Sequence, residues 1–244
     1  MTGRAPGSLV AAAGRTRPPP ERLYGRRRSR PPSARQARLM AEVLPLLRLA
    51  PAACVDPRAA FSPSVTEVWL EVGFGGGEHA LATVRARPEV GLLACEVFEN
   101  GIGSLLSRLV PEDGDQPAKL PGNLRIWDQD ARLLIRALPA ASIGRLFLMF
   151  PDPWPKARHA RRRFVHPQFL PELARILAPG AEWRIATDDP VHQAWLGEVL
   201  AGQDDFAVAS PVSVRPPGWP PTRYEAKALA EGRPVLYWRL IRSR

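Results

Sequence analysis

Short apolar runs alternate with amphipathic stretches along most of the chain, from residue 66 to the C-terminus. Short runs rich in β-branched and aromatic residues are typical of buried strands, and the longer amphipathic stretches between them are typical of helices. The expected strands are 66–74, 91–98, 123–127, 145–150, 182–188, 206–210 and 235–242. The expected helices are 78–88, 99–109, 131–139, 167–180 and 190–202, with a glycine at 180 ending the fourth.

This alternation predicts an α/β domain with a mostly parallel sheet and helices on both faces. The last two expected strands have no long helix between them, which predicts an antiparallel C-terminal edge. With 244 residues, the chain is long enough for one sizeable core with appendages. Residues 111–121 and 210–221 are rich in turn-forming residues, and we expect surface loops there.

The positive charge is concentrated at the N-terminus. Residues 1–40 contain ten arginines and one acid, a net charge of +9, whereas the whole chain carries +10. We therefore expect a basic Arg/Pro-rich arm at 1–40, disordered over 1–20, followed by a nearly neutral domain at 41–244. Such arms commonly bind nucleic acid through its phosphates; a solvated tail and an Arg-rich presequence are the alternatives.

Composition also excludes several classes of protein. No apolar run has the length of a membrane span, so we expect a soluble protein without membrane contact. The two cysteines, Cys54 and Cys95, cannot form a disulfide framework, which favours the cytoplasm. The four histidines, at 79, 159, 166 and 192, show no ligand spacing, so no metal site is expected. A serine nucleophile elbow and a phosphate-binding P-loop are also missing from the sequence.

The glycine-rich segment EVGFGGGE, at 71–78, overlaps the end of the first expected strand. Its glycines let the backbone turn tightly and approach a ligand. A dinucleotide fingerprint beginning at Gly73 requires a glycine at position 78, which is a glutamate here. Glu71 before Gly73 and Gly75 better suits a ligand with a cationic amino-acid end and no phosphate, such as S-adenosylmethionine. A turn with a structural role alone is the alternative.

Carboxylates also occur at the ends of the next two expected strands, with Glu96 near the end of the second and Asp130 after the third. Glu96 can accept hydrogen bonds from the hydroxyl groups of a ribose. Asp130, in the segment Asp128–Ala131, can reach the exocyclic amine of adenine, although an aspartate there can instead cap the following helix. Because the carboxyl ends of parallel strands share one edge of a sheet, we expect these acids to converge.

The stretch LFLMFPDPWPKARHARRRFVHP, at 146–167, places an aspartate between two prolines at the end of the fourth expected strand. The prolines stiffen the backbone, so Asp152 should be fixed at the edge of the sheet, and Trp154 offers a ring on which a base can stack. Five cations follow that suit RNA phosphates: Lys156, Arg158, Arg161, Arg162 and Arg163. A Pro-rich turn into a solvated helix end is the alternative.

Two later segments add polar groups. Asp188 ends the fifth expected strand and Asp189 follows it, where capping of the next helix is the alternative role. The segment PTRYE, at 221–225, combines a hydroxyl, a cation, an aromatic ring and an acid in an expected loop.

Taken together, EVGFGGGEHA, ACEVFENGIGSLL, NLRIWDQDA, LFLMFPDPWPKARHARRR, RIATDD and TRYE resemble the bacterial tRNA (guanine-N7-)-methyltransferase family. The resemblance runs from about residue 23 to the C-terminus, and PDPWPKARHARRR is its most specific part. It implies a single class I methyltransferase (Rossmann-like) domain that uses S-adenosylmethionine. It also implies methylation of a guanine in the tRNA variable loop, so the expected partner is tRNA, with a monomer favoured.

The resemblance implies roles for individual residues, with Asp152 as the active-site acid. The expected cofactor contacts are Glu71, Gly73, Gly75, Glu96, Asp130 and Asp152. The expected substrate contacts are Lys156, Asp188, Thr222, Arg223, Tyr224 and Glu225. Two positions depart from the family pattern: TRYE replaces the usual TKFE, which keeps the cation and the ring, and His192 stands where the family often has an aromatic residue.

Guanine N7 carries a lone pair in the plane of the ring, so the reaction needs orientation and stabilisation of the developing cation more than a strong base. We therefore expect Asp152 to orient the base and stabilise its charge. Amino methylation of a nucleic-acid base, a non-catalytic RNA-binding protein on the same fold, and an NAD-dependent oxidoreductase are the alternatives.

Overall fold

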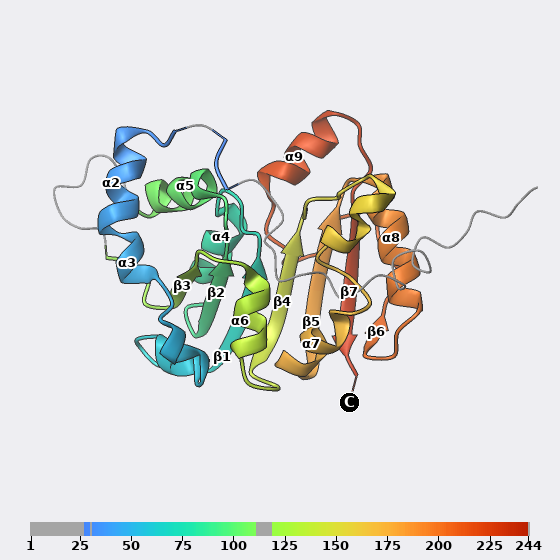
Figure 1. The fold of residues 1–244 in the computed structure, drawn as a ribbon, viewed down its shortest axis with the longest axis horizontal. Helices are drawn as coiled ribbons and strands as arrows, with labels where there is room; N and C mark the ends of the chain where they lie inside the picture. Colours follow the sequence, from blue (N-terminus) through green and yellow to red (C-terminus); the bar gives the residue numbers. More distant parts are fainter. Residues whose placement is uncertain (1–26, 30, 111–118, 244) are drawn as a thin grey trace, which may run out of the picture.

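The computed structural model describes residues 27–29, 31–110 and 119–243. These residues form one seven-stranded sheet in the order β3-β2-β1-β4-β5-β7-β6 (Figure 1). The strands are β1 (Glu67–Val72), β2 (Val90–Cys95), β3 (Leu124–Trp127), β4 (Ile143–Met149), β5 (Leu177–Thr187), β6 (Phe206–Val208) and β7 (Leu236–Arg242). The α-helices are α2 (Ala34–Glu42), α3 (Leu44–Leu47), α4 (Glu78–Ala86), α5 (Glu99–Leu109), α6 (Ala131–Ala137), α7 (Leu170–Ile176), α8 (Pro190–Ala201) and α9 (Arg223–Ala230). Three short 3-10 helices are η1 (Pro51–Cys54), η2 (Pro57–Ala60) and η3 (Ala157–Arg162).

The direction of the strands agrees with the sequence pattern. Strands β1 to β5 run parallel, and β7 runs antiparallel between β5 and β6. Strand β1 pairs with both β2 and β4, so the strand order reverses beside it. In sheets of this kind, ligands bind at the carboxyl ends of the strands next to that reversal. The predicted α/β fold with an antiparallel C-terminal edge is confirmed.

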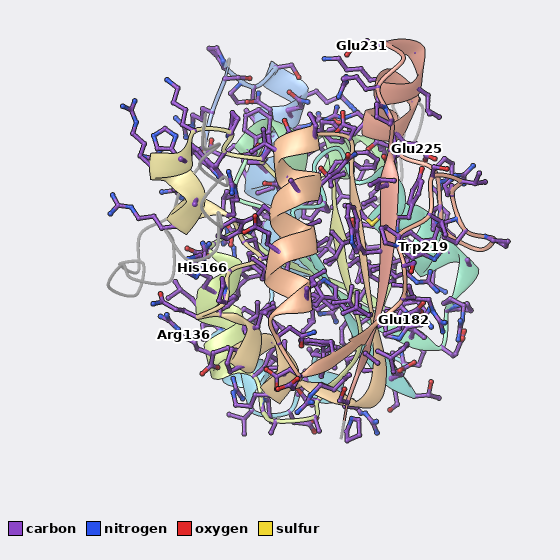
Figure 2. All side chains as sticks on the ribbon, turned by 90° about the vertical axis from the view of Figure 1, so that its right-hand side faces the viewer. Arg136, His166, Glu182, Trp219, Glu225 and Glu231 are labelled. Atoms are coloured by element: carbon purple, nitrogen blue, oxygen red, sulfur yellow. The ribbon has the colours of Figure 1, made fainter. Side chains whose placement is uncertain are left out.

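Helices cover both faces of the sheet. Side chains alternate along a strand, so Leu70 of β1 points to one face and Trp69 to the other. The face of Leu70 packs against α6, α7 and α8, and the face of Trp69 packs against α2, α3, α4 and α5. Figure 2 shows the two sides, with Arg136 on the first and Trp219 on the second.

Helix α7 is shorter than the predicted helix 167–180, which was wrong at both ends. The helix runs only from Leu170 to Ile176, and β5 begins at the next residue. Leu177 pairs with Ile143 of β4, and the register then shifts before Glu182. Gly180, predicted to stop the helix, has a φ of 78° inside the strand. Pairing with β4 therefore overrides the helical pattern of this segment.

The N-terminal segment is folded against the domain where the structure describes it. Residues 1–26, most of the predicted arm, lie outside the described residues. Helix α2 begins with a capping box between Ser33 and Gln36, packs against α5, and runs across the predicted boundary at residue 40. Arg35 donates a hydrogen bond to the carbonyl of Val110 at the end of α5. The division into an arm and a domain stays a prediction.

The two predicted loops differ from each other. Residues 111–118 of the first lie outside the described residues. The second, 210–221, is not a surface loop throughout, because Trp219 is buried with its ring edge-on to Tyr237 at 5.8 Å. Within the described ranges, no helix has the length and apolar character needed to cross a membrane.

Candidate active site

A cavity of about 360 Å³ opens at the carboxyl ends of β1, β2 and β4. Of the residues predicted to bind cofactor or substrate, the cavity is lined by Gly73, Gly75, Glu96, Asp130, Asp152, Trp154, Arg162 and Tyr224. The convergence expected from the strand ends is therefore present in the structure.

The glycine-rich turn forms the floor between β1 and α4. The amides of Gly73 and Phe74 donate to the carbonyl of Cys95, at 2.8 and 3.2 Å. Gly75 has a φ of 55°, and a side chain there would also meet the ring of Tyr224. A Cβ atom on Gly101 of α5 would lie 2.4 Å from the carbonyl oxygen of Gly75. The close approach of α5 to the turn thus depends on glycine at position 101, and the turn itself depends on glycine at position 75.

Glu96 is held by backbone amides. Its Oε2 accepts from the amide of Gly75 at 2.8 Å, and its Oε1 accepts from those of Val97 at 2.8 Å and Phe98 at 2.9 Å. Burial raises the pKa of the Glu96 carboxyl, and these hydrogen bonds oppose the rise. The carboxylate is therefore fixed in orientation at the cavity wall.

Asp130 performs the capping role and also lines the cavity. Its Oδ1 accepts from the amide of Arg132 at 2.9 Å, which caps α6, and lies 3.6 Å from the guanidinium of the same arginine. Asp128 instead forms an ion pair with Arg48 at 2.8 Å. The structure therefore distinguishes two aspartates that the sequence placed in one segment.

Glu71 is not among the residues that line the cavity. Its side chain is 1% exposed and shares the face of Trp69, where its Oε2 lies 3.0 Å from Nδ1 of His79 without hydrogen-bond alignment. The ring of Phe147 packs against His79 at 4.7 Å. Glu71 therefore lies outside the cavity in this structure, and its contact with a cofactor stays a prediction.

The segment between β4 and η3 carries two residues with unusual backbone angles. Phe150 and Trp154 have φ angles of 53° and 43°, in the left-handed region that non-glycine residues rarely adopt. Asp152, between them, is exposed and lines the cavity together with Trp154. The guanidinium of Arg162 lies 4.8 Å from the centre of the Trp154 ring. Strained backbone of this kind persists where the surroundings enforce it, often at functional sites.

The predicted cluster of five cations is divided by the structure. Lys156, Arg158 and Arg161 are exposed and remain suited to phosphates. Arg163 is only 2% exposed, so its predicted contact with phosphates was wrong. Its side chain points inward and donates to two backbone carbonyls, because the 3-10 turn of η3 carries this position to the face that packs on α8.

The segment PTRYE is not a loop but the start of α9, which corrects the prediction. Thr222 caps the helix in a capping box with Glu225. Glu225 is buried and accepts from the hydroxyl of Tyr237 at 2.6 Å. Tyr224 reaches the cavity, with its ring stacked on that of Phe150 at 6.3 Å. Sequence reasoning missed Phe150 as a wall of the cavity.

The remaining predicted contacts lie outside the cavity lining. Asp188 forms an ion pair with Arg233, and Asp189 caps α8 by accepting from the amide of His192 at 2.9 Å. Arg223 donates to the hydroxyl of Tyr224 at 3.1 Å. Across the described ranges, no group of three or more His, Cys, Asp or Glu side chains could hold a metal ion. Roles for Lys156, Asp188 and Arg223 in substrate binding stay predictions.

Known proteins are similar to this chain in sequence and in fold. Residues 66–238 match the family described as "Putative methyltransferase". The chain is 57% identical to the tRNA (guanine-N(7)-)-methyltransferase of Granulibacter bethesdensis over 224 residues, which cover 91% of this chain and 96% of that protein. It is 42% identical to the tRNA (guanine-N(7)-)-methyltransferase of Paramagnetospirillum magneticum over 229 residues, covering 91% and 94%.

Solved structures give the same fold at lower identity. The 16S rRNA methyltransferase KamB matches with a TM-score of 0.54 at 19% identity, covering 77% of this chain and 91% of that chain. The 16S rRNA (adenine(1408)-N(1))-methyltransferase from Catenulisporales acidiphilia matches with a TM-score of 0.50 at 18% identity, covering 80% and 94%. These similarities support the class I methyltransferase fold alone. The sequence identities extend to nearly the full length of the curated relatives, and the chain belongs to the tRNA (guanine-N(7)-)-methyltransferase family.

Proposed function

We propose that this chain transfers the methyl group of S-adenosylmethionine to N7 of a guanine in the variable loop of tRNA, forming N7-methylguanosine. The observation that carries the proposal is the position of Asp152 and Trp154 on a cavity that Glu96 and Asp130 also line. The 57% identity to a tRNA (guanine-N(7)-)-methyltransferase supports it. The cavity volume of about 360 Å³ is within the usual range for small-molecule ligands.

The residues at the ends of β2 and β3 fit the adenosine part of the cofactor. A carboxylate has about four lone-pair positions, and three backbone amides occupy three of those of Glu96. The remaining position, on Oε2, would accept one hydroxyl of the ribose. Both contacts of Asp130 described above use its Oδ1, which leaves Oδ2 for the amino group of adenine. When bound, the cofactor supplies a methyl group on a sulfonium that is ready for transfer.

Asp152 and Trp154 fit the acceptor base. The ring of Trp154 offers stacking area, and the exposed carboxylate of Asp152 lies two residues away on the same stiff segment. The lone pair of guanine N7 attacks the methyl carbon directly, so Asp152 orients the base and stabilises the positive charge that develops on it. The ring of Tyr224, stacked on Phe150, adds an aromatic wall to the same opening.

Exposed cations next to this opening fit the RNA backbone. Lys156, Arg158 and Arg161 lie on or before η3, directly after the segment that carries Asp152. Phosphate contacts position the RNA without reading its sequence, which suits a group of flexible surface cations. The basic arm at 1–40 would add affinity of the same kind.

The test is methyl transfer from labelled S-adenosylmethionine to an unmodified tRNA transcript, followed by borohydride and aniline treatment, which cuts the chain at N7-methylguanosine. We expect one cut, in the variable loop, and strongly reduced turnover for Asp152→Asn. Incorporation of label without cleavage would instead indicate amino or ribose methylation. Binding of tRNA without incorporation would indicate a non-catalytic RNA-binding protein. Full turnover by Asp152→Asn would contradict the role of Asp152.

A further inference from the structure

The backbone of the segment 151–155 lacks most of its own hydrogen-bond donors. Three of its five residues are prolines, so only Asp152 and Trp154 carry an amide N–H. Its carbonyl groups therefore depend on donors from elsewhere in the chain. Arg163 supplies donors for two of them: its Nε donates to the carbonyl of Pro153 at 3.0 Å, and its Nη2 donates to that of Trp154 at 3.0 Å.

These two hydrogen bonds fix the backbone on both sides of one residue. The carbonyl of Pro153 belongs to the peptide plane before the Cα of Trp154, and the carbonyl of Trp154 belongs to the plane after it. The angles between these planes and the Cα are φ and ψ of Trp154. A single rigid guanidinium bound to both carbonyls therefore holds both angles at once.

The conformation that Arg163 holds is one that the sequence disfavours. Trp154 has a φ of 43°, in the left-handed region that a non-glycine residue adopts only at a cost in free energy. Trp154 also precedes Pro155, and the residue before a proline is driven toward an extended conformation. Without its two donors, this segment should relax to an extended backbone, which would turn the ring of Trp154 and the carboxylate of Asp152 away from the cavity.

Arg163 is itself held in place by α8. Its side chain is 2% exposed, and its guanidinium lies 4.7 Å from the centre of the Trp195 ring. Trp195 in turn donates to the carbonyl of Val165 at 2.7 Å, so the indole ring that contacts Arg163 is itself held by a hydrogen bond. Burial lowers the pKa of Arg163, and the nearby charge of Asp189 opposes this effect. A buried guanidinium with this support is part of the framework and does not reach the solvent where RNA would bind.

We propose that Arg163 is a positioning residue for methyl transfer: it locks Trp154 in its left-handed conformation and so aims Trp154 and Asp152 at the guanine. This inference rests on the proposed function, and Arg163 acts through those two residues without touching the cofactor or the RNA. Two arginines in neighbouring positions therefore have different roles. Arg161 is exposed and fits a phosphate of the RNA, whereas Arg163 is buried and binds backbone carbonyls of the protein.

The kinetic test compares Arg163→Lys with the matched variant Arg161→Gln. A lysine is a point donor and cannot hold both carbonyls in the geometry of a guanidinium. We expect Arg163→Lys to lower kcat about ten- to a hundred-fold while the affinity for tRNA and its salt dependence stay as in the wild type. In Arg161→Gln the loss should instead fall on tRNA affinity, with the salt slope reduced by about one. Unchanged kcat in Arg163→Lys, or a loss of salt slope like that of Arg161→Gln, would overturn the inference.

A second measurement does not depend on methyl transfer. The chain has seven tryptophans, and with 5-fluorotryptophan the ¹⁹F resonance of Trp154 is assigned by its loss in Trp154→Phe. In Arg163→Lys, without RNA or cofactor, this resonance should shift or broaden, together with that of Trp195, which contacts Arg163. An unchanged Trp154 resonance would overturn the inference even if the wild type proved inactive on tRNA. A wild type that fails to methylate tRNA while Trp154 responds would count against the proposed function alone.

Arg163→Met covers the case in which Arg163→Lys does not fold. Methionine keeps an apolar stem beside Trp195 and buries no charge, so it avoids the cost of a buried ammonium with incomplete hydrogen bonds. It removes both donors, so the same fall in kcat and the same change at Trp154 are expected. Retention of wild-type kcat by a folded Arg163→Met would again overturn the inference.

Discussion

The hydroxyl group of Tyr237, on β7, donates a 2.6 Å hydrogen bond to the carboxylate of Glu225, on α9. The same carboxylate lies 2.9 Å from Nε of Arg215 and caps its own helix at Thr222. Burial, reinforced by Glu225, raises the pKa of Tyr237, so the phenol stays protonated and remains a donor. Through this contact the sheet fixes the first turn of α9 and therefore the place of Tyr224 above the cavity.

Tyr237→Phe should lower the free energy of unfolding by about 1.5–3 kcal/mol, since it removes a buried hydrogen bond to a charged group. It should also weaken tRNA methylation by loosening the first turn of α9. Urea unfolding measures the first effect and steady-state kinetics the second. Tyr224→Phe is the control, because that hydroxyl contacts only the exposed Arg223 in the described structure and should change stability little. Equal stability of Tyr237→Phe and the wild type would contradict the anchoring role.

Two glycines on α5 should differ in their response to alanine. A Cβ atom on Gly101 would lie 2.4 Å from the carbonyl oxygen of Gly75, whereas one on Gly103 would lie 3.3 Å from the side chain of Gln36. Gly101→Ala should therefore destabilise the protein by about 1–3 kcal/mol and distort the glycine-rich turn. Gly103→Ala meets only a flexible side chain and gains up to about 1 kcal/mol of helix propensity, so it should be close to neutral. Thermal unfolding and cofactor titration of both variants check this, and equal behaviour would be the contrary result.

Glu96→Gln should weaken binding of S-adenosylmethionine by about ten- to a hundred-fold, because charge-assisted hydrogen bonds contribute about 1.5–3 kcal/mol. The amide also offers one oxygen where the carboxylate offers two, so it cannot satisfy the amides of Gly75, Val97 and Phe98 together. Calorimetric titration with the cofactor measures the loss. Asp128→Asn is the control, since Asp128 pairs with Arg48 outside the cavity. Similar losses in the two variants would point to general destabilisation.

The sequence predicted the edge of the sheet where the site lies but not the direction of every side chain. Acids after successive strands must converge, because parallel strands end at one edge, and Glu96 and Asp130 do so. Glu71 does not, since side chains alternate along β1 and Glu71 points to the face of Trp69. That alternation was visible in EVWLEV.

Other features needed the three-dimensional structure, or a signal that was overlooked. A run of arginines does not reveal which one turns inward, so the role of Arg163 appears only once η3 packs against Trp195. The helix α9 was predictable, because Thr222 and Glu225 have the spacing of a capping box. The early end of α7 was not, since pairing between distant strands decided it.

His192 should make the stability of the protein depend on pH. The side chain is fully buried, and neither ring nitrogen has a hydrogen-bond partner among the described residues. Burial, with a smaller effect from the nearby Arg163 that Asp189 opposes, lowers the pKa of His192 to about 4. Below pH of about 6.5 the unfolded chain takes up a proton at this histidine and the folded chain does not. The free energy of unfolding is therefore unaffected by His192 above that pH. It decreases as the pH falls toward 4, by on the order of 3 kcal/mol in total.

Replacing the imidazole tests this directly. His192→Phe restores an aromatic ring of similar size without buried polar atoms, so it should remove this part of the pH dependence and stabilise the protein at pH 5 more than at pH 7. Urea unfolding of both proteins from pH 7.5 to 4.5 measures the difference. His166 is buried and its pKa is also lowered by burial, but it is present in both proteins and cancels in the comparison. Parallel stability curves would mean that His192 is hydrated or charged in the folded state.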